Sequence, residues 1–346
     1  MDFAFSEEQE MLRSAARDWL ADRYPIDRVI ALADGDGWDP AVWKELTELG
    51  WLDPDLGLLE HAVLAEESGY ALLPAPWFCS VALAGAAVGA PPSKPATLAW
   101  ADDAARTLRE AQTTVSCRAD DDVDGWRLTG VKRAVPDLAA ATTAVVVARE
   151  HDRVALFRVD LADHSETVHP LSTEDRTRRL GELRLDGTPA ERLDVDAGVA
   201  LRAVRRTALA LLACEATGIA QRALDLAVDY AKTRTQFDRP IGSYQGVSYR
   251  LADAYMALAL ARSLAYRAAW CVSVDDPAQD EAVASAAVAA ARAAVGGCEN
   301  AIQAMGGIGF TWDHPLHRYY KRAQWIAGFD GSPTRHRAEL ADLVLG

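Results

Sequence analysis

The chain has 346 residues, of which half are apolar and a quarter are charged, as in an ordinary globular protein of two or three domains. Its formal net charge of −15 at pH 7 argues against binding to nucleic acid or to anionic membrane surfaces, because both need a basic face. A single bound nucleotide remains possible, since it needs only a few local donors.

Residues 1–108 are predicted to form a helical N-terminal domain. Ser6 and Gln9 have the spacing of a capping box, in which a serine hydroxyl and a glutamine amide satisfy free backbone N–H groups at a helix start. Apolar residues then recur at helical spacing as far as Leu20. Further helices are expected over 41–49, 61–69 and 81–88.

Residues 109–195 have the pattern of a β-domain. Short runs, most of them rich in β-branched residues, are separated by Gly, Pro and Asp, which is typical of strands joined by turns. These runs are 113–118, 125–131, 143–149, 154–159 and 182–185. The three consecutive valines at 145–147 indicate a strand that is buried.

Residues 196–346 are predicted to form a C-terminal bundle of long helices. Helices are expected over 199–233, 245–272 and 280–305, and a fourth element begins near Pro315. The order helical, β, helical predicts an α+β fold with three domains, at 1–108, 109–195 and 196–346.

Neither a metal site nor a disulfide scaffold is expected, because the five cysteines are scattered and none forms a CxxC pair. The N-terminal segment is acidic and lacks the basic and apolar regions of a signal peptide. The alanine-rich run 282–297 is interrupted by Arg292 and looks too short to cross a bilayer. We therefore expect a cytoplasmic protein.

One motif lies where the first long C-terminal helix ends, and it contains Arg234, Phe237 and Gln245. An arginine just past a helix end can fork two hydrogen bonds onto a pyrophosphate, a phenylalanine offers a flat apolar surface, and a glutamine amide can donate and accept. The alternative is an ordinary corner between two helices, with Pro240 and Gly242 in the turn. The residues alone favour that alternative.

A second motif lies at the end of a later helix, where Gln303 is followed by Gly306, Gly307 and Gly309. Glycines permit positive φ angles and let a backbone approach a ligand closely. The simpler interpretation is a glycine cap followed by a loop, and the residues alone again favour it.

Together, however, the two motifs resemble acyl-CoA dehydrogenases in order and spacing. The resemblance includes the flanking stretch 218–225, Asp253, Pro315 and Arg318. It covers residues 205–337 closely, and the helical-β-helical order extends it loosely over the whole chain. It implies an N-terminal helical domain, a middle β-domain and a C-terminal four-helix domain.

In that family, FAD lies between two subunits. One chain's middle domain holds most of the flavin ring, and the neighbour holds the pyrophosphate and adenosine end. The resemblance implies that this chain supplies such contacts across a dimer interface, from Arg234, Phe237, Gln245, Gln303, Gly306 and Gly307. It also implies an acyl-CoA substrate and an electron-transfer flavoprotein as electron acceptor.

The reaction of the family needs a carboxylate base, because a proton leaves the acyl Cα while a hydride passes from Cβ to the flavin. The family commonly places a glutamate in the loop that corresponds to 328–332, where this chain has Asp330, which is one methylene shorter. Asp330 is therefore the candidate base, or else a loop residue stabilised by its turn. The family's other position for the base falls near Ala208, which has no carboxylate.

The middle domain departs further from the family. The glycine- and serine-rich segment that contacts the flavin corresponds to 97–103, which has no glycine, and the strand that covers the flavin corresponds to 134–137. The half-site for the flavin ring is thus expected to be eroded, while the half-site offered to a neighbour is intact.

This asymmetry predicts a subunit of a heteromeric α2β2 acyl-CoA dehydrogenase, as in actinobacterial enzymes that oxidise CoA thioesters of steroid side chains. Two alternatives stay open, a self-sufficient homomeric dehydrogenase and a non-catalytic structural or regulatory homologue. An all-helical module without a nucleotide is disfavoured, because both motifs occur together.

Overall fold

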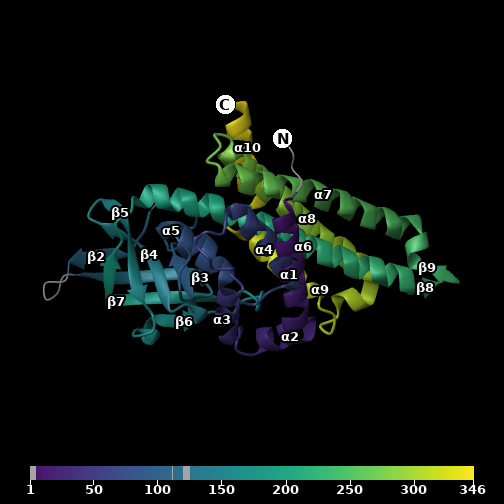
Figure 1. Cartoon of the computed structure of the whole chain (residues 1–346), viewed down its shortest axis with the longest axis horizontal. Coiled ribbons are helices and arrows are strands. Elements are labelled where there is room, and N and C mark those ends of the chain that lie inside the picture. The colour runs from purple at the N-terminus through teal and green to yellow at the C-terminus, as the bar shows by residue number, and fades with distance from the viewer. Residues whose placement is uncertain (1–4, 111, 120–124) are drawn as a thin grey trace. The chain divides into compact units, whose positions relative to one another are not determined.

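The computed structural model describes residues 5–110, 112–119 and 125–346 (Figure 1). The chain forms two compact units. The helical unit contains the described residues up to Ala31, Gly57–Leu73 and Leu209–Gly346, and the β-unit contains Leu32–Leu56 and the described residues of 74–208. The α+β fold class is confirmed, and the N-terminal helices are divided between the two units.

The N-terminal helices begin with the predicted capping box. The Gln9 N–H donates to Ser6 Oγ at 3.2 Å, and the Ser6 N–H donates to Gln9 Oε1 at 3.1 Å. The elements of this region are α1 (Glu7–Arg23), α2 (Ile26–Asp34), α3 (Ala41–Glu48), α4 (Leu58–Ala71), the π-helix η1 (Cys79–Gly85) and α5 (Ala86–Val88). The helix predicted over 81–88 therefore begins earlier and is mostly a π-helix, and α2 was not predicted.

The strands of the β-unit close on themselves. Their order is β1-β4-β2-β3-β7-β5, and because β4 also pairs with β5, the strands from β4 to β5 form a closed ring. They are β1 (Ala96–Ala99), β2 (Ser116–Ala119), β3 (Trp126–Pro136), β4 (Thr143–Glu150), β5 (Arg153–Asp160), β6 (Val168–Pro170) and β7 (Leu180–Arg192), with the short 3-10 helices η2 (Leu138–Ala140) and η3 (Ser165–Thr167) between them. Strand β1 corrects the sequence prediction, since it belongs to the sheet but lies in the stretch predicted as helical.

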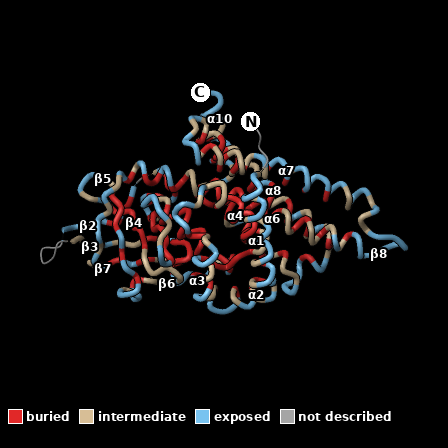
Figure 2. The backbone as a smooth tube through the Cα atoms, viewed as in Figure 1, coloured by how far each residue is buried: buried red, intermediate tan, exposed pale blue. Residues whose placement is uncertain are grey.

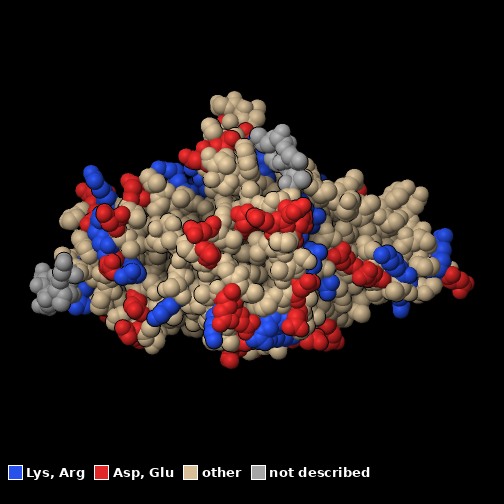
Figure 3. Space-filling view, in the orientation of Figure 1, with Lys and Arg blue, Asp and Glu red and all other residues tan. Residues whose placement is uncertain are grey.

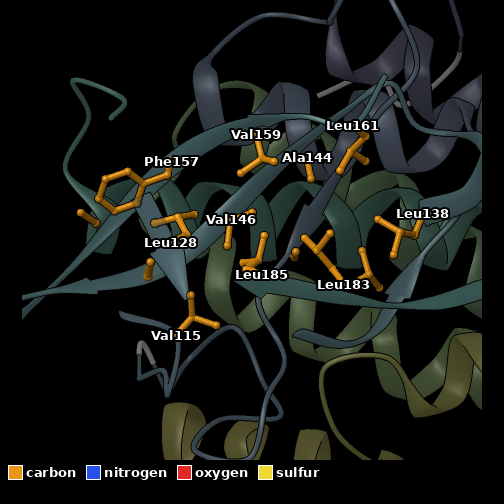
Figure 4. Packing of buried hydrophobic residues seen from close by; sticks show 14 residues of the cluster. Val115, Leu128, Leu138, Ala144, Val146, Phe157, Val159, Leu161, Leu183 and Leu185 are labelled. Atoms are coloured by element: carbon orange, nitrogen blue, oxygen red, sulfur yellow. The ribbon is translucent and has the colours of Figure 1, made fainter. Parts of the chain in front are cut away.

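Alternating side chains of these strands meet in an apolar core (Figure 4). On β4, Ala144 and Val146 point into this cluster. Val145 and Val147 lie on the other face of the strand and are also buried, at 4% and 1% exposed. The prediction of a buried strand over the three valines is therefore confirmed.

The C-terminal helices are α6 (Ala197–Thr233), α7 (Gln245–Ser273), α8 (Gln279–Met305), α9 (Leu316–Gly328) and α10 (Pro333–Leu345). Four of them, α6 to α9, agree with the prediction to within a few residues, and α10 was not predicted. Between α6 and α7 lie the two-residue strands β8 (Thr235–Gln236) and β9 (Arg239–Pro240) and the 3-10 turn η4 (Ile241–Ser243), and η5 (Gly306–Phe310) follows α8. Figure 1 shows β8 and β9 at the far tip of the α6–α7 pair.

Within the helical unit, α4 and α6 cross at backbone distance. A Cβ atom added to Gly218 would lie 1.9 Å from the carbonyl oxygen of Glu66, and one added to Gly69 would lie 2.1 Å from that of Glu215. Any side chain at either position would therefore push the helices apart. Gly218, which is part of the family resemblance, has a packing role here.

Helix α8 also corrects an expectation from the sequence. The helical stretch Gln279–Phe310 is long and apolar enough, by length and composition, to cross a membrane, whereas the alanine-rich run alone looked too short. However, 56% of its most apolar window is buried inside the protein. Contacts of α8 with α7, α9 and α10 account for this burial, as expected for a core helix.

Candidate functional site

The first predicted motif forms a β-hairpin that projects from the end of α6. Thr235 pairs with Pro240 and Gln236 pairs with Arg239, which leaves Phe237 and Asp238 as the two-residue turn. Their φ angles are 53° and 63°, as in a type I′ turn. Figure 2 shows the hairpin backbone as exposed.

Phe237 is the unusual residue of this turn. Positive φ angles are uncommon for residues other than glycine, asparagine and aspartate, and a bulky side chain there is strained. The Phe237 side chain is nevertheless 88% exposed. Its ring approaches Tyr244 edge-on, with 6.5 Å between the ring centroids. Phe237 thus occupies a costly conformation and buries little of its ring within this chain.

Side chains other than those predicted to bind FAD stabilise the hairpin. The Tyr244 hydroxyl donates to the carbonyl oxygen of Gln236 at 3.0 Å, and the Arg239 guanidinium lies 3.9 Å from the Tyr244 ring centroid. The Ile241 N–H donates to the carbonyl oxygen of Arg234 at 2.9 Å. No signal in the linear motif pointed to Tyr244, because its role depends on the hairpin geometry.

Arg234 lies at the base of the hairpin and is exposed. Its backbone N–H donates to the Tyr230 carbonyl at 2.8 Å and so extends the hydrogen bonding of α6. Within the part of the chain that the structure describes, we find no hydrogen bond or ion pair of its guanidinium. The guanidinium is therefore available for an anion supplied from outside this chain.

Two glycines of the second motif follow the end of α8, and different features explain why each lacks a side chain. Gly306 has a φ of 64° and a ψ of −136°, a conformation that favours glycine. A Cβ atom added to Gly307 would have no atom within 4 Å, so packing within this chain does not explain its missing side chain. The exposed backbone at Gly307 fits the close approach of an external group.

The structure brings these two motifs to the same end of the helical unit. Helix α7 begins at Gln245 and α8 ends at Met305, and the two helices run alongside each other in opposite directions. The Arg250 Nη1 donates to Asn300 Oδ1 at 3.2 Å, which joins the start of α7 to the last turns of α8. Gln245 bonds to Tyr249 at 3.3 Å, and Gln303 is exposed.

Asp330 does not join this group. It lies in the turn between α9 and α10, with a φ of 53°, and is 4% exposed. Ile326 and Ala327, just before it, line a small cavity with Ala290 of α8. Gly306 follows Ala290 by 16 positions, which corresponds to about 24 Å along a helix. The candidate base and the FAD-end residues therefore need not serve the same active site.

The segments expected to face the flavin ring lie in the β-unit, where their polar groups are engaged. Lys132, which is fully buried, donates from Nζ to the Trp100 carbonyl at 2.9 Å, to Asp102 Oδ2 at 2.7 Å and to Thr113 Oγ1 at 2.8 Å. Burial raises the pKa of Asp102, but the hydrogen bonds from Lys132 and Thr113 outweigh burial, so its pKa falls to about 2. Burial lowers the pKa of Lys132 to about 8, although Asp102 opposes the shift.

The second segment expected to face the flavin ring, 134–137, also has hydrogen-bonding groups engaged within the β-unit. Pro136 has no backbone N–H, and its carbonyl oxygen accepts from Thr97 Oγ1 at 2.6 Å. The Asp137 N–H donates to the Arg179 carbonyl at 2.7 Å, and Asp137 Oδ2 accepts from the Cys79 thiol at 3.1 Å. Pro136 and Asp137 therefore offer a flavin ring no free backbone N–H, so this part of the segment fits the ring poorly.

Comparisons with known proteins agree with the motifs. Residues 199–345 match the family model described as acyl-CoA dehydrogenase, C-terminal domain. The chain is 33% identical over 339 residues to the acyl-CoA dehydrogenase IpdE2 of Mycobacterium tuberculosis, and the match covers 94% of each. A variant of the Tcur3481–Tcur3483 steroid ACAD is similar in structure, with a TM-score of 0.85, 29% identity and 98% of each chain covered. The ChsE4–ChsE5 complex from Mycobacterium tuberculosis has a TM-score of 0.83 and 26% identity, over 100% of this chain and 99% of that one.

Proposed function

This chain belongs to the acyl-CoA dehydrogenase family, whose members are FAD-binding oxidoreductases that act on CH–CH groups, and from that premise we propose a specific role for it. It is the subunit of a heteromeric dehydrogenase that lends the pyrophosphate and adenosine half-site of FAD to a partner subunit. The substrate is a CoA thioester of a steroid side chain or of another bulky acyl group.

The observation that carries this proposal is Phe237. A bulky side chain that is 88% exposed in a left-handed conformation costs stability without a return in buried area inside this chain. That cost is understandable if the ring contacts a group held by another subunit. Arg234, with its guanidinium available to an anion, and Gly307, with open space around it, fit the same interpretation.

The poor fit of the β-unit to a flavin ring supports a partner that holds the ring. Lys132 and Asp102 satisfy each other within the β-unit, and Pro136 has no backbone N–H to donate. Two similar structures, the Tcur3481–Tcur3483 steroid ACAD and the ChsE4–ChsE5 complex, support the substrate class and the heteromer.

In this role each residue has a definite task. Arg234 forks hydrogen bonds onto the pyrophosphate, Phe237 covers an apolar part of the cofactor, and the Gly307 backbone approaches it closely. Gln245 and Gln303 supply neutral amide contacts. Bound FAD supplies the acceptor for the hydride that leaves the acyl Cβ. Asp330 is the candidate group to take the Cα proton in a site formed by this chain.

Two further parts of the proposal concern the surroundings of the enzyme. An electron-transfer flavoprotein is proposed as the acceptor that reoxidises the flavin, because the family resemblance implies one. The cytoplasm is proposed as the location, from the scattered cysteines.

The decisive experiment compares variants of the hairpin in the assembled enzyme, made by expressing this chain with the product of its neighbouring gene. Phe237→Gly relieves the backbone strain, so the chain should be as stable as the wild type or more stable, yet the complex should lose FAD. Arg234→Ala should also lower FAD content. Arg292→Ala, at an exposed position of α8, is the control and should retain the wild-type FAD content.

The number of flavins distinguishes the alternatives. The proposal expects less than one FAD per chain in the complex and none retained by this chain alone. Stoichiometric FAD and dehydrogenation by the isolated chain would show a self-sufficient homomer instead. Unchanged flavin content in both hairpin variants would leave the non-catalytic homologue as the remaining interpretation.

A further inference from the structure

Trp312 forms an exposed aromatic surface that the family motifs do not include. It lies two residues after the end of η5, and its side chain is 60% exposed. The His317 imidazole stacks on the indole, with 4.6 Å between centroids and 22° between planes. Lys321 Nζ lies 4.4 Å from the ring centroid, and the Arg318 guanidinium carbon lies 6.0 Å from it.

The neighbours of Trp312 come from α9. His317 and Lys321 are one helical turn apart on this helix. Because His317 covers one face of the indole and the side chain is still 60% exposed, the opposite face accounts for most of that exposure. Two hydrogen bonds hold the loop in this position, from Thr311 Oγ1 to the Ile308 carbonyl at 2.8 Å and between His317 Nε2 and the Trp312 carbonyl at 3.3 Å.

The chemistry of this surface suits a planar group that carries negative charge. An open indole face stacks on planar rings, including nucleobases, and the Lys321 ammonium beside it attracts phosphate. Arg318 is buried, at 5% exposed, and is engaged within the chain, so we assign it no contact with the ligand. Asp313 adds one negative charge nearby in the sequence.

The position of the surface indicates which nucleotides can reach it. Trp312 and the Gly306–Gly307 backbone are joined by the short η5 segment, so both lie at the end of α8 where the FAD-end residues gather. FAD and a CoA thioester both carry adenosine next to phosphate groups. Adenosine with an adjacent phosphate is therefore the chemistry that the two ligands of this enzyme family share.

We propose that Trp312 is a stacking platform for the adenine ring of a bound nucleotide, with Lys321 supplying positive charge to its phosphates. This inference rests on the proposed function, because it assumes that a nucleotide binds at this end of the helical unit. It adds a binding residue, and it predicts that the adenine end is held by stacking as well as by hydrogen bonds.

The test titrates nucleotides into the full chain, alone and in the assembled enzyme, by calorimetry. ADP represents the adenosine end of FAD, and adenosine 3′,5′-bisphosphate represents that of CoA. Trp312→Ala should weaken binding of the preferred nucleotide by about tenfold, within the range of one base stacked on an aromatic side chain. Trp312→Phe should retain most of the affinity. Val344→Ala, at a residue of α10 that is 61% exposed, is the control and should bind as the wild type does.

The outcomes separate this inference from the function on which it rests. Preference for ADP assigns the platform to FAD, and preference for the bisphosphate assigns it to the CoA thioester; either supports the platform. Equal affinity in the wild type and Trp312→Ala overturns it. If Trp312→Ala disrupts subunit assembly but not nucleotide binding, the platform is a protein contact and the inference also fails. If Arg234→Ala lowers FAD content while the Trp312 variants do not, only this inference fails.

Discussion

At the scale of single residues, Gly218 determines how closely α4 and α6 can approach. The Cβ atom of Gly218→Ala would lie 1.9 Å from the Glu66 carbonyl oxygen, which belongs to a rigid helix backbone and cannot easily move. We expect Gly218→Ala to lower the free energy of unfolding by about 1–3 kcal/mol, as overpacked cores do. Urea unfolding followed by circular dichroism measures this change.

Gly296→Ala is the matched control for Gly218→Ala. Gly296 lies within α8, and a Cβ atom there would meet no atom within 4 Å. Alanine should therefore stabilise the helix by about 0.5–1 kcal/mol through its greater helix propensity. A stabilised Gly218→Ala would mean that the helices can separate at no cost, contrary to the close crossing.

Asp330 is suited to a test by substitution because its backbone tolerates asparagine. Its φ of 53° lies in the left-handed region, which asparagine adopts about as readily as aspartate. Asp330→Asn should therefore add no backbone strain. If Asp330 is the base, removal of its negative charge should lower kcat of the assembled enzyme by about 10²–10⁴ fold. A lower steady-state turnover with an unchanged unfolding midpoint would support this role. Unchanged turnover would assign the base to the partner subunit.

At the scale of elements, the ion pair between Lys132 and Asp102 joins β3 to the loop after β1. Both side chains are buried, at 0% and 1% exposed, and Nζ and Oδ2 are 2.7 Å apart. Asp102→Asn would leave the Lys132 ammonium buried without its counter-charge. We expect a loss of about 3–5 kcal/mol in the free energy of unfolding at neutral pH, measured by urea denaturation.

The same pair predicts a dependence on acid. The folded-state pKa of Asp102 is about 2, below its usual value of 3.8. Because the folded pKa is the lower one, the stabilisation from this carboxylate is complete above about pH 4 and is lost as the pH falls towards 2. The wild type should lose stability over this interval more steeply than Asp102→Asn does. Equal acid slopes would contradict the assignment.

The elements also show which parts of the fold can be predicted from local sequence patterns. The long C-terminal helices follow from apolar periodicity and were predicted nearly to the residue, and the strands β3, β4 and β5 follow from β-branched runs. Strand β1 was missed because Ala96–Ala99 is buried on both faces and has no alternation, and β6 was missed because it has three residues. The closed strand order depends on pairings between distant segments, which periodicity does not contain.

The candidate site likewise contains some features that the sequence predicts and others that depend on the folded structure. Arg234, Phe237, Gly306 and Gly307 could be named from two linear motifs because each motif is a continuous segment. The left-handed Phe237, the Tyr244 brace and the Trp312 surface depend on side chains that meet only after folding. The separation of Asp330 from the FAD-end residues likewise follows from helix lengths and packing.

At the scale of the whole molecule, α7 presents an apolar face that this chain does not cover. Tyr249, Tyr255, Met256 and Leu260 are each at least 60% exposed. Three of them, Tyr249, Met256 and Leu260, recur at positions i, i+7 and i+11, which places them on one helix face. Figure 3 shows few charged side chains on the surface over α7. Contiguous apolar surface of this kind marks a contact with another protein.

We therefore expect the partner subunit to cover the α7 face. The double variant Met256→Lys and Leu260→Lys would have to bury two ammonium groups in that contact, which is unfavourable without counter-charges. The variant should fold, because both side chains are exposed in the isolated chain. Its complex with the partner should dissociate at concentrations at which the wild type stays assembled, as measured by light scattering coupled to size-exclusion chromatography.

Val344→Lys separates a specific contact from a general effect of added charge. Val344 is 61% exposed, as Met256 is, but lies near the end of α10 rather than on the α7 face. It should leave the assembled mass unchanged. Equal dissociation by both variants would indicate non-specific repulsion or a contact that includes α10. An intact complex with the α7 double variant would show that the α7 face lies outside the interface. If only the α7 variant loses assembly, and the same sample then loses FAD, the two proposals support each other. The cofactor would then depend on a contact formed away from the hairpin.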